Sequence, residues 1–460
     1  MKKVFTFLKR FLIIYLIYIL VFGLLIFKLP YYTKSNLAYD TNKMLSPSID
    51  DSYAYLVEEN NEAFNVRLAL IENAKTSIDL IYYKYLEDEA GKIFTGALLK
   101  KANEGIKITI IIDGVRPLKN NMYKALAIHE NICFKIYEPL SAVFVKRTHN
   151  VMHEKILLTD DNYGLIGGRN IESRFLLDNN ETITLDRDVL VYSKNEKSEV
   201  GIEIKDYLNE LHEAKHVKDY NPTIKKSYLL YQEELIDLYN TFYSSNDYNL
   251  EETLNENSVK VDRVSFIRSP LNRGTKEPVL FNVVKDLASN DQKVVIQSPY
   301  ITKSRLMEKD FKQNSNKNIT FITNNLETNP NMFGLSGYIR IRKKLAQNYN
   351  VYEYQKENSI HAKTITIGNN ISIIGSQNID HRSLYLSTES AVVIYSEDFQ
   401  KVLNKELDNL ITNSLLVNSD GTYQEKENLE AVKLSGFKNF RIRALSLISS
   451  LFNEMLFKTI

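Results

Sequence analysis

Residues 153–160 read His-Glu-Lys-Ile-Leu-Leu-Thr-Asp, and residues 361–368 repeat the pattern as His-Ala-Lys-Thr-Ile-Thr-Ile-Gly. The first copy is followed by Gly167-Gly168-Arg169-Asn170 and the second by Gly375-Ser376-Gln377-Asn378. Equivalent residues lie 208 positions apart throughout (153 and 361, 155 and 363, 170 and 378, 174 and 382). A constant offset over so many positions indicates a duplicated structural unit, so we expect two halves of similar fold.

Each copy has the pattern of a β-hairpin. Residues 155–159 and 163–166 flank the turn residues 160–162, and residues 363–367 and 371–374 flank the turn residues 368–370. The Asp, Asn and Gly residues of these turns supply local hydrogen bonds or positive φ. Residues two positions apart on a strand face the same way, so each hairpin should present its His and Lys together.

The flanking sequence alternates between strand and helix patterns. The expected helices are 67–75, 93–103, 277–288 and 338–348, and the expected strands are 77–83, 107–113, 293–300 and 318–323. Residues 199–253 are expected to be a helical connector. The alternation predicts an α/β fold with a parallel or mixed sheet in each half, residues 56–255 and 256–420.

Composition narrows the kinds of site. The 460 residues are 44% hydrophobic and 25% charged, which is ordinary for a globular protein, and the net charge of +1 gives no overall attraction to nucleic acid. Cys133 is the only cysteine, which rules out an intrachain disulfide, and we expect it to be a small buried residue. His149 and His153 have the spacing of zinc ligands on a helix, but the strand pattern argues against a helix there, so no metal is expected.

The N-terminus predicts a membrane anchor within residues 1–35. Four basic residues precede Phe11–Phe27, which is 17 uncharged and mostly apolar residues, close to the lower limit of ~17–25 for a spanning helix. A cleaved signal peptide is the alternative, but no small-residue cleavage pattern follows. The basic residues before the span favour a cytoplasmic N-terminus and a catalytic body outside the cytoplasm.

The paired motifs resemble those of the phospholipase D superfamily, and the sequence is most similar to bacterial cardiolipin synthases. Further resemblance lies in Ser298-Pro299-Tyr300, in 337–340 and in Ile379-Asp380-His381-Arg382-Ser383. The resemblance implies two similar α/β halves packed around one shared active site. It also implies that Asp186 orients His153 and that Glu389 orients His361, although Asp188 is an alternative to Asp186 two residues further on.

The resemblance assigns the aspartate that ends the first motif, Asp160, to the catalytic set. The second motif departs from the family, because Gly368 stands where an aspartate is expected. Both positions fall in a predicted turn, so we expect activity to survive this departure.

The motif residues can exchange phosphodiesters without a metal or another cofactor. Lys155 and Lys363 can neutralise the phosphate oxygens, and Asn170 and Asn378 can donate hydrogen bonds to them. Gly168 and Ser376, beside those asparagines, are expected to belong to the same phosphate site. One neutral histidine can attack phosphorus while the other transfers protons to and from the alcohols. We assign His153 as the nucleophile and His361 as the acid and base.

Residues 436–460 are predicted to form an amphipathic helix. Phe437, Phe440, Leu447 and Leu451 fall at helical spacing, with basic residues near its start. Such a helix can lie in the membrane interface, and docking on the protein body is the alternative.

The leading hypothesis is a membrane-bound phosphatidyltransferase of the cardiolipin synthase type. It would transfer a phosphatidyl group from phosphatidylglycerol to a second lipid hydroxyl through a phosphohistidine. The alternatives are a phospholipase D that uses water, a membrane-tethered nuclease, and a membrane scaffold with a decayed site. Nucleic acid is not a partner in the leading hypothesis, and the oligomeric state has no sequence signal.

Overall fold

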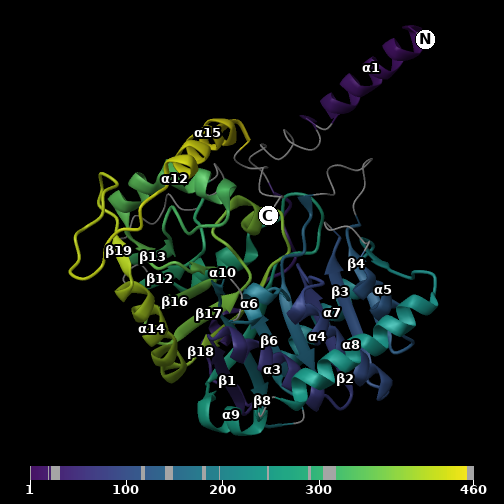
Figure 1. Ribbon diagram of the computed structural model, residues 1–460. Coiled ribbons are helices and arrows are strands. Elements are labelled where there is room, and N and C mark those ends of the chain that lie inside the picture. The colour runs from purple at the N-terminus through teal and green to yellow at the C-terminus, as the bar shows by residue number, and fades with distance from the viewer. Residues whose placement is uncertain are drawn as a thin grey trace.

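The computed structural model describes residues 2–18, 20–21, 32–114, 120–139, 149–178, 183–195, 197–245, 248–288, 292–303 and 318–452. Two α/β halves form the body of the molecule, the first coloured purple to teal and the second green to yellow (Figure 1). Each half is built on one large sheet, as the repeated sequence pattern predicts.

The first half has a mixed sheet with the order β10-β1-β8-β6-β5-β2-β3-β4-β9. Its strands are β1 Ser52–Val57, β2 Ser77–Tyr82, β3 Lys107–Asp113, β4 Ile132–Tyr137, β5 Lys155–Thr159, β6 Tyr163–Gly167, β8 Asp188–Ser193, β9 Val217–Asp219 and β10 Val259–Lys260. Strands β2, β3 and β4 are parallel, and the other pairs are antiparallel. The predicted hairpin is β5 and β6.

The second half repeats this topology with the order β11-β18-β17-β16-β12-β13-β14-β19. Its strands are β11 Arg263–Arg268, β12 Val294–Gln297, β13 Ile319–Asn324, β14 Asn350–Tyr354, β16 Thr364–Ile367, β17 Ile371–Gly375, β18 Ser390–Tyr395 and β19 Ser414–Leu416. The hairpin β16–β17 occupies the place of β5–β6 in the first sheet. The duplication read from the motifs is therefore confirmed for the whole fold of each half.

Helices cover the outer faces of both sheets and fill the space between them (Figure 1). The first sheet is covered by α3 Asn60–Asn73, α4 Glu89–Asn103 and α5 Asn121–Ala127, with α8 Lys226–Ser244 packed on α4 and α5, and the second by α10 Val279–Leu287 and α12 Met332–Asn348. Between the sheets lie α7 Glu199–Glu213 and α14 Glu397–Thr412. The short helices are α2 Thr41–Met44, α6 Ser173–Leu176, α9 Leu250–Asn257 and α13 His381–Tyr385.

The inner faces of the two sheets share one apolar core. Ile156 and Ile166 of the first hairpin are buried in the same cluster as Ile374 and Val392 of the second half. Burial of this apolar surface holds the halves together, since each sheet alone would expose it to water. The two hairpins are consequently held close to one another, and their His-x-Lys motifs can meet.

Two expectations about the body need correction. The first sheet begins at Ser52, before the predicted start at residue 56. It also includes β10, which pairs with β1 although it lies beyond the predicted boundary at 255/256. Cys133 is exposed rather than buried. Its neighbours Ile132 and Phe134 point into the core, and strand alternation turns the Cys133 side chain the other way.

The two ends of the chain carry the remaining helices. Helix α1, Lys2–Tyr18, exposes apolar side chains such as Phe11 and Ile14, while residues 1, 19 and 22–31 of the predicted anchor lie outside the described residues. Within the described part of the chain, no helix is both long and apolar enough to cross a bilayer. Helix α15, Gly436–Phe452, packs on α12 and buries Ile442, and residues 453–460 of the predicted tail are not described.

Candidate active site

Short backbone pairings bring the two motifs to one place. The strand before His361, β15 Ser359–Ile360, pairs in parallel with β7 Thr184–Leu185 of the first half, and the His361 N–H donates to Leu185 O at 2.7 Å. In the equivalent pairing, the His153 N–H donates to Thr388 O of the second half at 2.9 Å. His361 of the second half therefore lies beside the residue just before Asp186, and His153 of the first half lies beside the residue just before Glu389.

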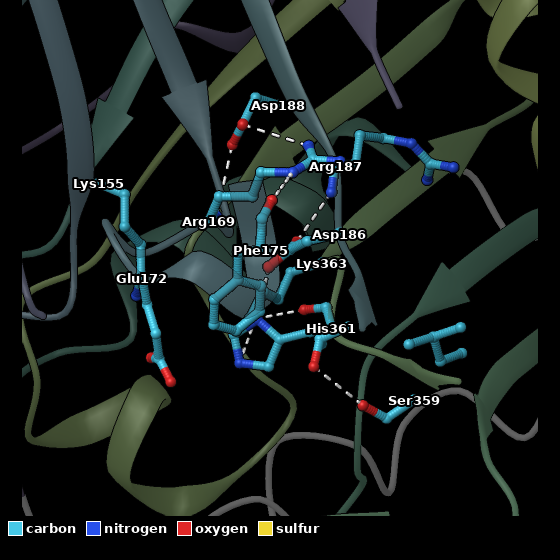
Figure 2. A network of polar contacts seen from close by, with 12 residues as sticks. Lys155, Arg169, Glu172, Phe175, Asp186, Arg187, Asp188, Ser359, His361 and Lys363 are labelled. Atoms are coloured by element: carbon cyan, nitrogen blue, oxygen red, sulfur yellow. Dashed lines mark hydrogen bonds and ion pairs between the residues drawn. The ribbon is translucent and has the colours of Figure 1, made fainter. Parts of the chain in front are cut away.

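The orienting carboxylates are exchanged between the halves, which corrects the predicted pairing. His153 Nδ1 lies 3.0 Å from Glu389 Oε2, and His361 Nδ1 lies 2.6 Å from Asp186 Oδ2 (Figure 2 shows the second pair). Position along the chain suggested that each half supplies its own acid. The pairings across the halves place each acid against the other half's histidine instead, and a carboxylate at Nδ1 favours the tautomer that carries its proton there and leaves Nε2 unprotonated.

The alternative acid Asp188 has a structural role. Its carboxylate is fully buried and accepts from Arg67 at 2.8 Å and from Arg169 at 3.2 Å. Figure 2 shows the contact of Arg169 with Asp188. Arg169 also donates to the carbonyl of Val57, so this network fixes the end of the first hairpin. Asp186 is thus an orienting acid, and Asp188 supports the loop that carries it.

The motif lysines are buried beside their histidines. Lys155 and Lys363 each donate to the backbone carbonyl of the histidine two positions earlier, and Lys363 Nζ lies 3.2 Å from His361 Nε2. Burial, followed by the charge of Lys363, lowers the pKa of Lys155 to about 7. Burial likewise lowers the pKa of Lys363 to about 8. Two desolvated cations held together favour an anionic ligand.

Both histidines favour the neutral form without substrate. Burial, followed by the charge of Lys155, holds the pKa of His153 well below its usual range. Burial and Lys363 lower the pKa of His361 to about 3. An aromatic ring packs on each imidazole, Tyr83 on His153 with ring centres 4.9 Å apart and Phe175 on His361 at 5.1 Å. The rings therefore limit movement of the imidazoles.

The two orienting acids differ in charge. Burial opposes ionisation of Asp186, but the charge of Lys363 and the hydrogen bond with His361 outweigh it and hold the pKa of Asp186 well below its usual range. Burial raises the pKa of Glu389 to about 7. At neutral pH His361 thus faces a full negative charge and His153 a partly protonated carboxyl, so the near-symmetric site is electrostatically asymmetric.

The four residues expected to bind phosphate fall into two groups. Asn170 and Asn378 line the cavity in front of the histidines, and their Oδ1 atoms have no hydrogen-bond partner among the described residues. Gly168 and Ser376 lie behind the histidines instead. A Cβ at Gly168 would lie 2.1 Å from Asp186 Oδ1, and Ser376 Oγ donates to Glu389 Oε2 at 2.5 Å. Neither residue is among those that line the cavity, and each packs against an orienting acid, so their phosphate role stays a prediction.

Asp160 lies outside the site, which corrects its place in the predicted catalytic set. It has a φ of 56° in the β5–β6 turn, and Oδ1 accepts from the N–H groups of Thr76 at 2.7 Å and Ser77 at 3.2 Å. At about 3.3 Å per residue, it lies about 16 Å along the strand from Lys155. Gly368 occupies the equivalent turn with a φ of 59°, so its replacement of aspartate leaves the site residues in place.

The cavity also contains residues without a role in the sequence-based prediction. They include Tyr83, Lys84, Arg174, Tyr300, Asn331, Asp380 and Arg382. The constant offset of 208 already paired Arg174 with Arg382, a signal that could have identified both. Lys84 and Asn331 have no such signal, because folding alone brings their loops to the cavity.

Metal ligation was tested on the described residues. They contain no group of three or more His, Cys, Asp or Glu side chains arranged to hold a metal ion. His149 is buried, with its Nδ1 3.4 Å from the Arg382 guanidinium.

Comparison with known proteins gives consistent results. Residues 68–199 and 283–411 match the family model described as cardiolipin synthase, PLD-like domain. Cardiolipin synthase C of Escherichia coli is 23% identical over 402 residues, covering 76% of this chain and 82% of that protein. A Helicobacter pylori protein described as uncharacterized is 26% identical over 421 residues, covering 81% of each.

A solved structure shares the fold. The phosphatidylserine synthase of Haemophilus influenzae has a TM-score of 0.63 and 17% identity, and the match covers 92% of this chain and 96% of that one. Each family-model match spans one His-x-Lys hairpin and the strands around it. The chain therefore belongs to the family of cardiolipin synthase PLD-like domains, within the phospholipase D superfamily.

Proposed function

We propose that the protein is a membrane-bound phosphatidyltransferase that makes cardiolipin from phosphatidylglycerol. The observation that carries the proposal is the pair of histidines that line one cavity, each bonded through Nδ1 to a carboxyl group of the opposite half. Two buried lysines beside them supply positive charge for a phosphodiester. The names of the cardiolipin synthase relatives support a lipid substrate.

In the first half-reaction, His153 Nε2 attacks phosphorus and the bond between phosphorus and the leaving glycerol oxygen breaks. His361 gives its proton to that oxygen, so phosphatidyl-histidine and a neutral alcohol result. The ionised Asp186 favours the protonated form of His361, and the bound phosphate adds negative charge that raises its pKa. His153 faces the partly protonated Glu389 and stays neutral, as a nucleophile must.

In the second half-reaction, the hydroxyl of another lipid is the nucleophile. His361, now neutral, accepts the hydroxyl proton while the oxygen attacks the phosphohistidine and the bond from phosphorus to nitrogen breaks. Lys155, Lys363, Asn170 and Asn378 stabilise the phosphoryl oxygens in both steps. Water in place of the lipid would make the enzyme a phospholipase D.

We further propose that both ends of the chain contact the membrane. The predicted span Phe11–Phe27 would anchor the protein with its body outside the cytoplasm. Helix α15 exposes Phe437 and Phe440 beside cationic residues, and Lys438 donates to the carbonyls of Glu327 and Asn329. Asn329 lines the cavity, so insertion of α15 into a lipid surface would hold the cavity mouth against lipid.

Expression in a bacterium that lacks cardiolipin tests the function. The lipids are extracted, separated by thin-layer chromatography and compared with those from an H153A strain expressing equal protein. Cardiolipin above the H153A level is the expected result. Phosphatidic acid alone would indicate a hydrolase, and no lipid change together with cleavage of single-stranded DNA would indicate a nuclease, so either outcome contradicts the proposal.

A further inference from the structure

The repeat places two arginines, Arg174 and Arg382, at equivalent positions on the cavity wall, but their surroundings differ. Arg174 Nε forms an ion pair with Glu172 Oε1 at 2.7 Å, and its guanidinium lies 4.7 Å from the centre of the Phe175 ring. The positive charge of Arg174 is therefore compensated within its own half by an ion pair, although its Nε, like that of Arg382, has no hydrogen-bond partner among the described residues.

The second half has Asp380 at the position of Glu172, and the shorter acid is used differently. Asp380 Oδ1 caps helix α13 by accepting from the N–H groups of Arg382 at 2.7 Å and Ser383 at 3.1 Å. Burial also raises the pKa of Asp380 to about 6, so its carboxylate is still mostly ionised at neutral pH, but its Oδ1 is occupied by these two N–H groups. No ion pair equivalent to that of Arg174 forms with the Arg382 guanidinium among the described residues.

Arg382 is 8% exposed, and within the described part of the chain its Nε and Nη1 are buried without a hydrogen-bond partner. Its Nη2 lies 3.4 Å from Nδ1 of His149, a residue that carries no negative charge. Burying a guanidinium whose N–H groups lack acceptors costs free energy. A ligand in the cavity that supplies those acceptors would account for its presence there. Burial accordingly lowers the pKa of Arg382.

The same cavity wall includes a second cation, Lys84, which is 6% exposed. Arg382 and Lys84 are additional to the motif lysines, which already serve the reacting phosphate. Both line the cavity that contains His153 and His361, so an anion bound by Arg382 would lie in the same cavity as the reacting phosphate. The planar guanidinium of arginine can donate two parallel N–H groups to two oxygens of one phosphate.

We infer that Arg382 forms a second phosphate subsite that selects substrates with a second phosphate group. The inference rests on the proposed function. Two sources supply such a group: the phosphodiester of the lipid that accepts the phosphatidyl group, and the second phosphate of a diphosphate-linked lipid donor. The first source gives the enzyme its preference for a phospholipid over a simple alcohol as acceptor.

Competing acceptors test the subsite with purified protein in detergent micelles. Labelled phosphatidylglycerol is offered with ethanol, so that transfer to lipid gives cardiolipin and transfer to the neutral alcohol gives phosphatidylethanol. In R382Q, cardiolipin formation should fall about ten- to hundredfold while phosphatidylethanol formation changes by less than about threefold. A second arm replaces the donor with CDP-diacylglycerol, and selective loss there would assign the subsite to the donor's second phosphate.

Matched variants separate charge from packing. R382K should retain part of the preference for the lipid acceptor, and R174Q should change it less than R382Q, because Arg174 is already paired with Glu172. Equal loss of both products in R382Q would overturn the subsite. A wild-type protein that makes neither product would contradict the proposed function instead.

A binding measurement tests the subsite without turnover. Inorganic pyrophosphate should raise the Tm of the wild-type protein more than that of R382Q, because the variant lacks the second group of donors. Equal shifts in the two proteins would overturn the inference even if the enzyme proved inactive on every lipid.

Discussion

Histidines 153 and 361 occupy near-identical sequence contexts but different electrostatic ones. Asp186 is held ionised beside His361, whereas burial leaves Glu389 partly protonated beside His153 at neutral pH. In a low-dielectric site a full charge on the neighbouring acid determines which imidazole holds a proton best. The difference supports His153 as nucleophile and His361 as acid and base, an assignment that stays a prediction.

Replacing each orienting acid by its amide separates the two roles. D186N should lower kcat/KM by about 100-fold or more, because an amide cannot stabilise the imidazolium and permits the wrong tautomer. E389Q should lower it by about tenfold or less, because the glutamine resembles the protonated acid. Steady-state transfer kinetics on both variants check this, and equal losses would contradict the asymmetry.

The lysines predict the alkaline limb of the pH profile. A lysine is charged below its pKa, so Lys155 and Lys363 lose their charge as the pH rises through about 7 and about 8. Without substrate to restore those charges, kcat/KM should fall across this window. A profile measured from pH 6 to 9 at constant ionic strength checks the prediction, and a flat profile would contradict it.

Among the elements, the two hairpins were the most predictable from sequence. Turn residues 160–162 and 368–370 define their length, and short runs rich in apolar and β-branched residues define their strands. Local turn chemistry and strand period need no knowledge of distant residues. The burial of Cys133 and the limits of the first sheet were mispredicted, because the face of β4 that the core covers and the pairing of β10 with β1 depend on the assembled sheet.

Asp160, in the turn of the first hairpin, is expected to affect the stability of the fold and not the catalytic rate. Asp160 ties the turn to the start of β2 through the N–H groups of Thr76 and Ser77. D160A should lower the free energy of unfolding by about 1–3 kcal/mol and leave kcat/KM of the folded protein within about twofold. Urea unfolding and lipid transfer assays measure the two effects, and a hundredfold activity loss in stable protein would restore Asp160 to the catalytic set.

At the scale of the whole molecule, the site exists only where the halves meet. Arg187 of the first half is buried and donates from Nη1 to Gln297 Oε1 at 2.7 Å and to Thr364 Oγ1 at 2.9 Å in the second half. Its backbone N–H also donates to Asp186, the acid that orients His361. Arg187 therefore both joins the two halves and holds the acid that orients His361.

Removing the charge of Arg187 tests this coupling. R187M should lower the free energy of unfolding by about 3–5 kcal/mol, because Glu58 loses its buried partner and the acceptors across the interface are left unmatched. The midpoint of urea unfolding measures the change, with R174Q as a control arginine of the cavity wall. A loss below about 1 kcal/mol would show that the interface does not depend on Arg187.

The surface of α15 predicts how the whole molecule meets lipid. Replacing Phe437, Phe440 and Leu447 by glutamate should lower binding to vesicles of phosphatidylglycerol and phosphatidylethanolamine, because each side chain is mostly exposed and apolar. Sedimentation with vesicles measures binding, and activity on micellar lipid serves as the control for folding. Unchanged sedimentation would show that α15 does not contact the lipid surface.

The sequence by itself determined the duplication and the hairpins, and it predicts the chemistry of the two histidines, two lysines and two asparagines, because these depend on local pattern and residue type. Only the tertiary structure decided which acid serves which histidine, that Gly168 and Ser376 support those acids, and that Arg382 differs from Arg174. These relations join residues of opposite halves or depend on burial. A linear pattern does not encode them, since they arise only when two sheets bury their apolar faces against each other.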